Sequence, residues 1–200
     1  TGSSILPEVE SLSKGILYWR SFSHWIGGMG VLLFILAILP MSGGSTMNLM
    51  KAESPGPSVG KLVPRIQQTA FLLYAIYFAM TIIELILLLC GSMKPFDALC
   101  LTLGTAGTGG FGIKNDSLAS YSVYSQVIIT IFMFLFGVNF TVYYYILIKK
   151  VKDALRMEEV RGYFLLFSAA AIAIALNLSL SGNPGFWHNL QQSAFQVASV

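Results

Sequence analysis

Charged residues are scarce in this chain of 200 residues: only 10% are Asp, Glu, Lys or Arg, whereas 55% are hydrophobic. A typical soluble domain carries about 25% charged residues. The composition therefore indicates an all-α polytopic membrane protein, and the length is better counted in membrane spans than in soluble domains.

Cysteines, histidines and paired catalytic motifs are also scarce. Cys90 and Cys100 have neither metal-binding nor redox spacing, so two separate buried thiols are expected rather than a disulfide. The sequence has no His-Glu-x-x-His motif, which argues against an intramembrane enzyme using Glu84, His24 or a cysteine. The formal charge of +3 is too small to indicate a nucleic-acid partner. We expect no enzymatic activity, no organic cofactor and no nucleic acid.

Long apolar segments are abundant, and each is near the length of about 20 residues that a helix needs to cross a bilayer. They occupy 21–41, 62–90, 121–149 and 161–181. A segment too short to cross, 95–104, begins with Pro95, a residue well suited to the first position of a helix. A second short, semi-polar helix is predicted at 187–200.

A glycine-rich loop, residues 105–112, follows the first short helix. Four glycines in eight residues cannot continue a helix stably, because glycine loses the most backbone freedom on ordering. At membrane depth, irregular backbone persists only where protein buries it or where it lines a wet cavity. Carbonyl oxygens released from a helix there can replace the water around a cation, and the helix dipole favours a cation at the same end. The loop is therefore predicted to bind an ion.

Basic residues are divided unevenly between the two sides of these spans. Eight lie in or beside the linkers that follow the first and third spans, whereas three lie on the other side, with Arg20 near the interface. Excess Lys and Arg mark cytoplasmic loops. The linkers 47–65 and 149–161 are therefore expected in the cytoplasm, with the glycine loop facing outside.

The order of span, short helix, glycine loop and span recurs along the chain. The segment Asp97-Ala98-Leu99-Cys100-Leu101 aligns with Ser193-Ala194-Phe195-Gln196-Val197. Thr1-Gly2-Ser3, at the beginning of the chain, resembles Thr108-Gly109-Gly110. The chain is expected to be a fragment that holds the end of repeat 1 (1–50), a linker (51–65), repeat 2 (62–152) and the first half of repeat 3 (153–200). Within repeat 2, the spans are 62–90 and 121–149, the pore helix 95–104 and the filter 105–112.

Several small or amide side chains within the spans are predicted to serve helix packing. Gly27, Gly28, Gly30 and Gly137 allow neighbouring backbones to approach closely. A hinge at the first three glycines is the alternative. Asn139 needs hydrogen-bond partners in lipid, so a bond to a neighbouring helix is favoured over a pore-lining role.

Two ionisable side chains also lie within the spans. His24 is expected to be packed or interfacial rather than a ligand or proton relay, because no carboxylate or second histidine is near it in sequence. Glu84 lies six residues before Cys90, about 9 Å along a helix. A structural or interfacial role for Glu84 is favoured, and attraction of cations is the alternative.

Five motifs together resemble the Trk/Ktr/HKT superfamily of cation transporters, and they are most similar to its bacterial TrkH branch. They are Trp25-Ile26-Gly27-Gly28-Met29-Gly30, Glu53-Ser54-Pro55-Gly56-Pro57, Gly109-Gly110-Phe111, Gly137-Val138-Asn139-Phe140 and Glu158-Glu159-Val160-Arg161. The resemblance implies one polypeptide with four non-identical span–pore helix–filter loop–span repeats, arranged with pseudo-fourfold symmetry around a potassium path. It also implies a homodimer in the bacterial inner membrane, bound to cytosolic nucleotide-binding regulatory subunits of the TrkA/KtrA type.

The resemblance also implies roles for individual residues. Gly2 and Gly109 match the filter glycines of repeats 1 and 2. The residues whose carbonyl oxygens would face K⁺ are Thr1, Gly2, Ala106, Gly107, Thr108 and Gly109, with Thr105, Gly110 and Phe111 as support. In sodium-preferring relatives the first-repeat glycine is often serine, so Gly2 favours potassium. A sodium or mixed transporter and a non-conducting membrane scaffold remain the alternatives, and the family's gating loop falls beyond Val200.

Overall fold

The computed structural model describes residues 8–30, 66–147, 149–181 and 185–199. Within these ranges the chain is entirely helical and contains no strand. The helices are α1 (Lys14–Gly28), α4 (Ile66–Cys90), α5 (Pro95–Ala106), α6 (Val123–Gly137), α7 (Thr141–Leu147), α8 (Val151–Arg156), α9 (Glu158–Leu180) and α10 (Phe186–Ser199). The all-α class expected from the sequence is confirmed.

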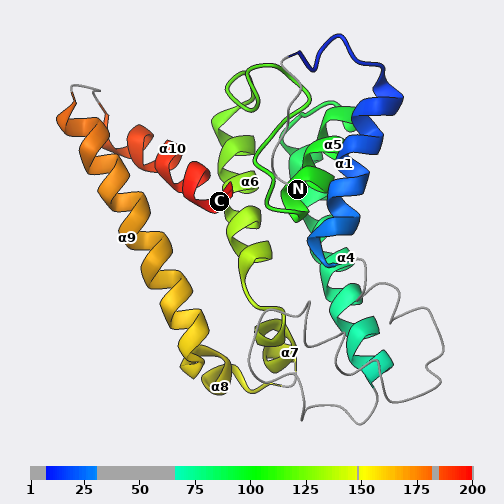
Figure 1. Ribbon diagram of the computed structural model, residues 1–200, viewed down its shortest axis with the longest axis vertical. Coiled ribbons are helices and arrows are strands. Elements are labelled where there is room, and N and C mark those ends of the chain that lie inside the picture. Colours follow the sequence, from blue (N-terminus) through cyan, green and yellow to red (C-terminus); the bar gives the residue numbers. More distant parts are fainter. Residues whose placement is uncertain (1–7, 31–65, 148, 182–184, 200) are drawn as a thin grey trace.

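Two described helices are long and apolar enough to cross a membrane: the Ala70–Cys90 part of α4, and α9. They run along the long axis of the molecule, roughly parallel to α6 (Figure 1). Large apolar side chains on both are exposed, including Phe71 and Ile86 on α4 and Phe164 and Leu166 on α9. Apolar surface of this extent is suited to lipid or to further protein.

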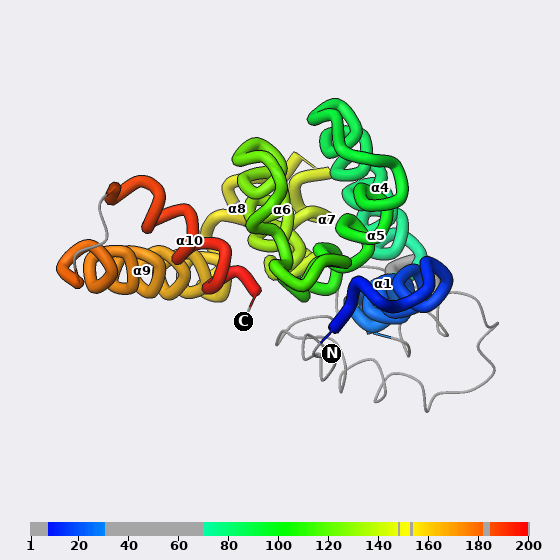
Figure 2. Tube along the Cα trace, turned by 90° about the horizontal axis from the view of Figure 1, so that it is seen from above, coloured from blue at the N-terminus to red at the C-terminus, as the bar shows by residue number. Residues whose placement is uncertain are grey.

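The short helix α5 lies at the centre of the first group of helices, packed against α1, α4 and α6. Figure 2 shows α1 beside α5, on the side away from α9. Nearly every residue from Ala98 to Ala106 is buried. One core cluster joins Leu88, Leu101 and Met133 from three helices. The short helix is therefore held inside protein, as a helix that stops partway through a membrane requires.

The second short helix, α10, turns back from the end of α9 and reaches α6 (Figures 1 and 2). Its polar residues Asn189 and Ser193 are buried. The Asn189 side-chain amide donates to Ser179 Oγ at 3.0 Å. Long helix followed by short helix, α4–α5 and then α9–α10, is the order expected for the repeats.

The single span expected at 121–149 is instead broken. The axes of α6 and α7 differ by 94°. Val138 leaves the helical conformation with φ −72° and ψ 140°, and the Asn139 side chain then accepts from the Thr141 backbone N–H at 3.0 Å. That bond is an N-cap, so it favours a new helix start at this point. Helices α6 and α7 reach the length and apolarity of a membrane-crossing helix only when the two are taken together as one broken span.

The first expected span, 21–41, also differs. Helix α1 begins seven residues earlier, at Lys14, and ends at Gly28. Gly30 has φ 82°, a left-handed conformation that glycine adopts without steric cost. The glycine run therefore ends helix α1, which neither the packing role nor the hinge anticipated. Residues 31–41 and the linker 51–65 lie outside the described residues.

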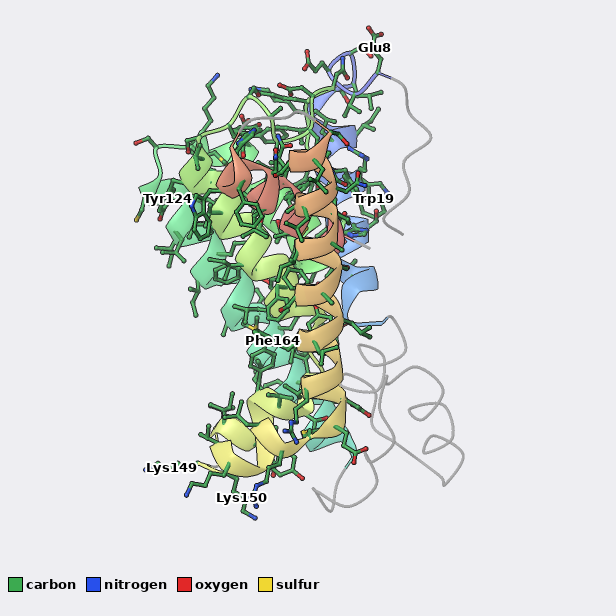
Figure 3. All side chains as sticks on the ribbon, turned by 90° about the vertical axis from the view of Figure 1, so that its left-hand side faces the viewer. Glu8, Trp19, Tyr124, Lys149, Lys150 and Phe164 are labelled. Carbon is green, nitrogen blue, oxygen red and sulfur yellow. The ribbon has the colours of Figure 1, made fainter. Side chains whose placement is uncertain are left out.

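The described ends of α5, α9 and α10 differ by at most three residues from the predicted ranges 95–104, 161–181 and 187–200, and helix ends are usually uncertain by one or two residues. The predicted start of the span 62–90 lies outside the described residues. The predicted pore helix 95–104 continues to Ala106, so Thr105 and Ala106 belong to the helix rather than to the loop. Within the charged link before α9, Val151–Arg156 forms the short helix α8. Lys149 and Lys150 lie at the end of the molecule opposite Glu8 (Figure 3), as the charge sorting requires.

Candidate functional site

Helix α5 ends in a Schellman motif that forms the entrance of the glycine loop. The Gly109 N–H donates to the Gly104 carbonyl at 3.1 Å and the Thr108 N–H to the Thr105 carbonyl at 2.7 Å. Thr108 takes the left-handed position with φ 57°. Glycine normally occupies that position, and a β-branched residue there is strained. The turn releases the backbone from the helix two residues later than the sequence predicted.

Two side chains on consecutive turns of α1 hold this loop. The His24 Nε2–H donates to the Gly107 carbonyl at 2.9 Å, because an imidazole nitrogen facing a carbonyl oxygen must carry the proton. Arg20 Nη1 donates to the Gly112 carbonyl at 3.1 Å. Between them lies the Phe111 ring, whose centroid is 4.0 Å from Arg20 Cζ and 5.1 Å from the His24 ring. We call Arg20, His24 and Phe111 the α1 clamp.

Close packing against the clamp explains the glycines of the loop. An added Cβ at Gly109 would lie 2.8 Å from His24 Nε2 and 2.8 Å from Phe111 Cε1. An added Cβ at Gly107 would collide with the His24 ring. Real Cβ contacts are essentially never shorter than 3.0 Å. Both positions therefore require glycine while His24 stays in place.

The predicted ion-facing carbonyl oxygens divide into two groups. The Gly107 oxygen accepts from His24 Nε2 at 2.9 Å and from Thr108 Oγ1 at 2.7 Å. Since a carbonyl oxygen has two lone pairs, none remains for an ion. The oxygens of Ala106, Thr108 and Gly109 receive no hydrogen bond from any described residue. In this arrangement Gly107 holds the loop, and the other three remain candidates for the ion.

The loop also contacts α10. Gly110 has φ 64°, and its added Cβ would lie 2.5 Å from Ser199 Cβ at the end of α10. The Gly110 carbonyl accepts from Ser117 Oγ at 3.1 Å. The loop therefore lies between α1 and α10.

Gln126 at the start of α6 connects the exit of the loop to α10. Its side-chain nitrogen donates to the Leu118 carbonyl at 3.0 Å and to the Tyr121 carbonyl at 3.1 Å. Its side-chain oxygen accepts from Gln191 Nε2 at 3.1 Å. One amide thus joins two repeats, and Gln126 was not among the residues selected from the sequence.

A double-mutant cycle tests this connection. We expect Gln126→Leu and Gln191→Leu together to destabilise the complete protein less than the sum of the two single changes. The shared hydrogen bond should appear as a coupling energy of about 1 kcal/mol. Thermal unfolding in detergent measures it, and additivity would contradict a direct bond between the two amides.

The glycines that were predicted to serve helix packing differ in how closely other atoms surround them. An added Cβ at Gly28 would lie 2.5 Å from Tyr77 Oη, 2.9 Å from the Ala106 oxygen and 3.0 Å from Gly107 Cα. One at Gly137 would collide with the hydroxyl of Tyr163 on α9. At Gly27 no described atom lies within 4 Å, so the described residues give no packing reason for glycine there.

The polar side chains of the spans are placed as follows. His24 is buried with 6% exposure and packs on the loop, a contact that the sequence alone did not indicate. Asn139 Nδ2 donates to Glu159 Oε2 on α9 at 2.8 Å, the expected bond to a neighbouring helix. The Glu84 side chain has no exposed surface, and Leu88 one turn later is equally buried. The structural or interfacial role expected for Glu84, and the alternative of cation attraction, stay predictions.

Cys90 and Cys100 are free thiols, as expected, but only Cys100 is buried, and the expected burial of Cys90 is wrong because its side chain is exposed. Thr1 and Gly2 lie outside the described residues. Among the described residues, no group of three or more His, Cys, Asp or Glu could hold a metal ion. The clamp residue Arg20 had one usable signal in the sequence. It lies four residues before His24, so the two share one face of a helix with Leu17.

The contribution of His24 can be measured directly. In the complete protein, His24→Ala should lower the free energy of unfolding by about 1–3 kcal/mol, because the buried Gly107 carbonyl loses a donor. The other histidine, exposed His188, provides the matched control. Thermal unfolding should show a loss for His24→Ala and almost none for His188→Ala. Equal losses would contradict the clamp.

The chain is similar in sequence to several known proteins. Residues 1–180 match the family model TrkH, described as "Cation transport protein". The Trk system potassium uptake protein TrkH of Vibrio parahaemolyticus is 36% identical over 72% of this chain and 30% of its own length. TrkH of Escherichia coli K12 is 32% identical over 100% of this chain and 42% of its own length. The chain thus spans less than half of these relatives.

A solved structure is also similar. The crystal structure of the potassium transporter TrkH from Vibrio parahaemolyticus superimposes with a TM-score of 0.74 and 26% sequence identity. The superposition covers 96% of this chain and 39% of that one.

Proposed function

Because this chain belongs to the TrkH family of cation transport proteins, we propose that it is part of a protein that takes up potassium through a channel-like pore. The observation that supports the proposal most directly is the free backbone oxygen set at the end of α5. The oxygens of Ala106, Thr108 and Gly109 are released from helix hydrogen bonding beside a helix carboxyl end. Such oxygens can replace part of the hydration shell of K⁺.

The selectivity filter combines several such loops. The loop 105–112 supplies one, and Thr1 and Gly2 belong to the equivalent loop of repeat 1. The ranges 1–50, 62–152 and 153–200 represent successive repeats of four around one axis. Gly107, Thr105, Gly110 and Phe111 support the loop rather than contact the ion.

Uptake needs no chemical step in this subunit. The membrane potential supplies about 2.3 kcal/mol per charge per 100 mV, which is enough to accumulate a monovalent cation inside. The proposed pore is gated. A glycine at position 2 favours potassium, and sodium or mixed transport is the alternative.

The proposal extends to location and partners. The protein lies in the bacterial inner membrane with the linkers 47–65 and 149–161 in the cytoplasm and the filter loops outside. It forms a homodimer and binds nucleotide-binding regulatory subunits of the TrkA/KtrA type. The orientation is supported by Lys149 and Lys150, which lie together at one end of the molecule (Figure 3), because excess Lys and Arg mark cytoplasmic loops.

Flux measured with the purified, complete protein in liposomes tests the proposal. We expect the membrane potential to drive potassium into the liposomes, at a higher rate than sodium. A folded protein that conducts neither ion would favour the scaffold alternative, and equal rates would favour the mixed transporter.

A further inference from the structure

One face of α4 is buried from Tyr77 to Leu88 and is unusually polar. Tyr77, Thr81, Glu84 and Leu88 have exposed fractions of 0%, 6%, 0% and 0%, and their spacing of four, three and four places them on one side of the helix. The Tyr77 hydroxyl donates to the Trp25 carbonyl at 2.8 Å. Thr81 Oγ1 donates to the Tyr77 carbonyl and accepts from Trp25 Nε1. The two hydroxyls of this face therefore have partners.

Glu84 is the exception on this face. Neither of its carboxyl oxygens receives a hydrogen bond from a described residue, although both are buried. The side chain of Thr105 lies beside the Glu84 carboxyl. Thr105 is in the last turn of α5, the turn that leads directly into the glycine loop.

Hydrogen-bond accounting limits what the carboxyl can be. The Thr105 hydroxyl donates its one proton to the Leu101 carbonyl at 2.8 Å, so its oxygen can only accept from a neighbour. An ionised carboxylate has no proton to give and would face that oxygen unpaired. A neutral carboxylic acid has one donor and satisfies the contact.

A bound metal cation fits this place less well than a proton. Among all the described residues, the buried side-chain oxygens without a hydrogen-bond partner are the two of Glu84 and that of Thr102. Hard cations in proteins take six or more oxygen ligands. An isolated carboxylate in an apolar interior is so unfavourable that the group takes up a proton instead.

We propose that Glu84 is a proton-binding site behind the filter. It is a neutral carboxylic acid whose O–H donates to Thr105 Oγ1 and positions the last turn of α5. The acid adds no negative charge to the ion path, which separates its role from the attraction of cations. The protonation state does not depend on the proposed potassium uptake, whereas the effect on flux does.

Infrared spectroscopy of the complete protein in lipid tests the protonation state. The wild-type protein at neutral pH should show the carbonyl stretch of a buried carboxylic acid, which disappears in Glu84→Gln. The exposed Glu158 provides the control, and Glu158→Gln should leave the band unchanged. A band that survives Glu84→Gln, or a wild-type spectrum without any protonated acid, would overturn the proposal.

Two substitutions test the positioning role. Glu84→Gln keeps a donor without a charge, so potassium flux should stay within about twofold of the wild-type value, whereas Glu84→Leu should lower it at least about fivefold, the equivalent of one lost hydrogen bond. Loss of flux in a folded Glu84→Gln protein would show that the negative charge is needed, and would overturn the neutral acid. If the wild-type protein carries no potassium, the infrared result still decides the protonation state.

Discussion

Gly109→Ser in the complete protein is expected to reduce the preference for potassium over sodium by about tenfold or more. The added Cβ would lie 2.8 Å from His24 Nε2, 2.8 Å from Phe111 Cε1 and 3.1 Å from the Gly104 carbonyl. Overpacking of this kind typically costs about 1–3 kcal/mol, and about 1.4 kcal/mol corresponds to a factor of ten. Because the clamp and the end of α5 both border this position, the strain should displace the free oxygens of the loop.

Relative flux of the two ions into liposomes measures this effect. Gly15→Ser provides the matched control, because an added Cβ at Gly15 has no described atom within 4 Å. Selectivity should fall for Gly109→Ser and stay the same for Gly15→Ser. A folded Gly109→Ser protein with wild-type selectivity would count strongly against the loop as a filter.

Gly28→Ala is expected to destabilise the complete protein by about 1–3 kcal/mol, although it adds only one methyl group. That methyl would lie 2.5 Å from Tyr77 Oη, 2.9 Å from the Ala106 oxygen and 3.0 Å from Gly107 Cα. Two of these neighbours belong to the end of α5 and the start of the loop. Potassium uptake should therefore fall together with stability.

The adjacent glycine supplies the control for this change. An added Cβ at Gly27 meets no described atom within 4 Å, and alanine is favoured over glycine inside a helix by about 0.5–1 kcal/mol. Gly27→Ala should therefore be neutral or slightly stabilising in thermal unfolding. Similar losses for both variants would contradict the packing of α1 against α5.

Local patterns were sufficient for much of the fold. The apolar runs predicted α4 and α9, and Pro95 predicted the start of α5. The alignment of 97–101 with 193–197 predicted α10. These features depend on hydrophobicity and chain-breaking residues within short windows, so a single sequence contains them.

What the sequence did not predict depends on contacts between distant residues. The hydrogen bond from His24 to Gly107 joins residues 83 positions apart, and the Gln126–Gln191 bond joins residues 65 apart. The break after Gly137 was missed because the apolar run continues across it. The Asn139 cap that starts α7 is a single polar residue and does not interrupt that run. The Gly107 carbonyl was assigned to the ion because nothing in the sequence places His24 beside it.

Anomalous X-ray scattering from the complete protein crystallised with Tl⁺ in place of K⁺ tests the central claim most directly. We expect a peak on the repeat axis within coordination distance of the Thr108 and Gly109 carbonyl oxygens, with the Gly107 oxygen still bonded to His24. Ion density confined to another part of the protein, with these two oxygens buried in packed side chains, would contradict the account.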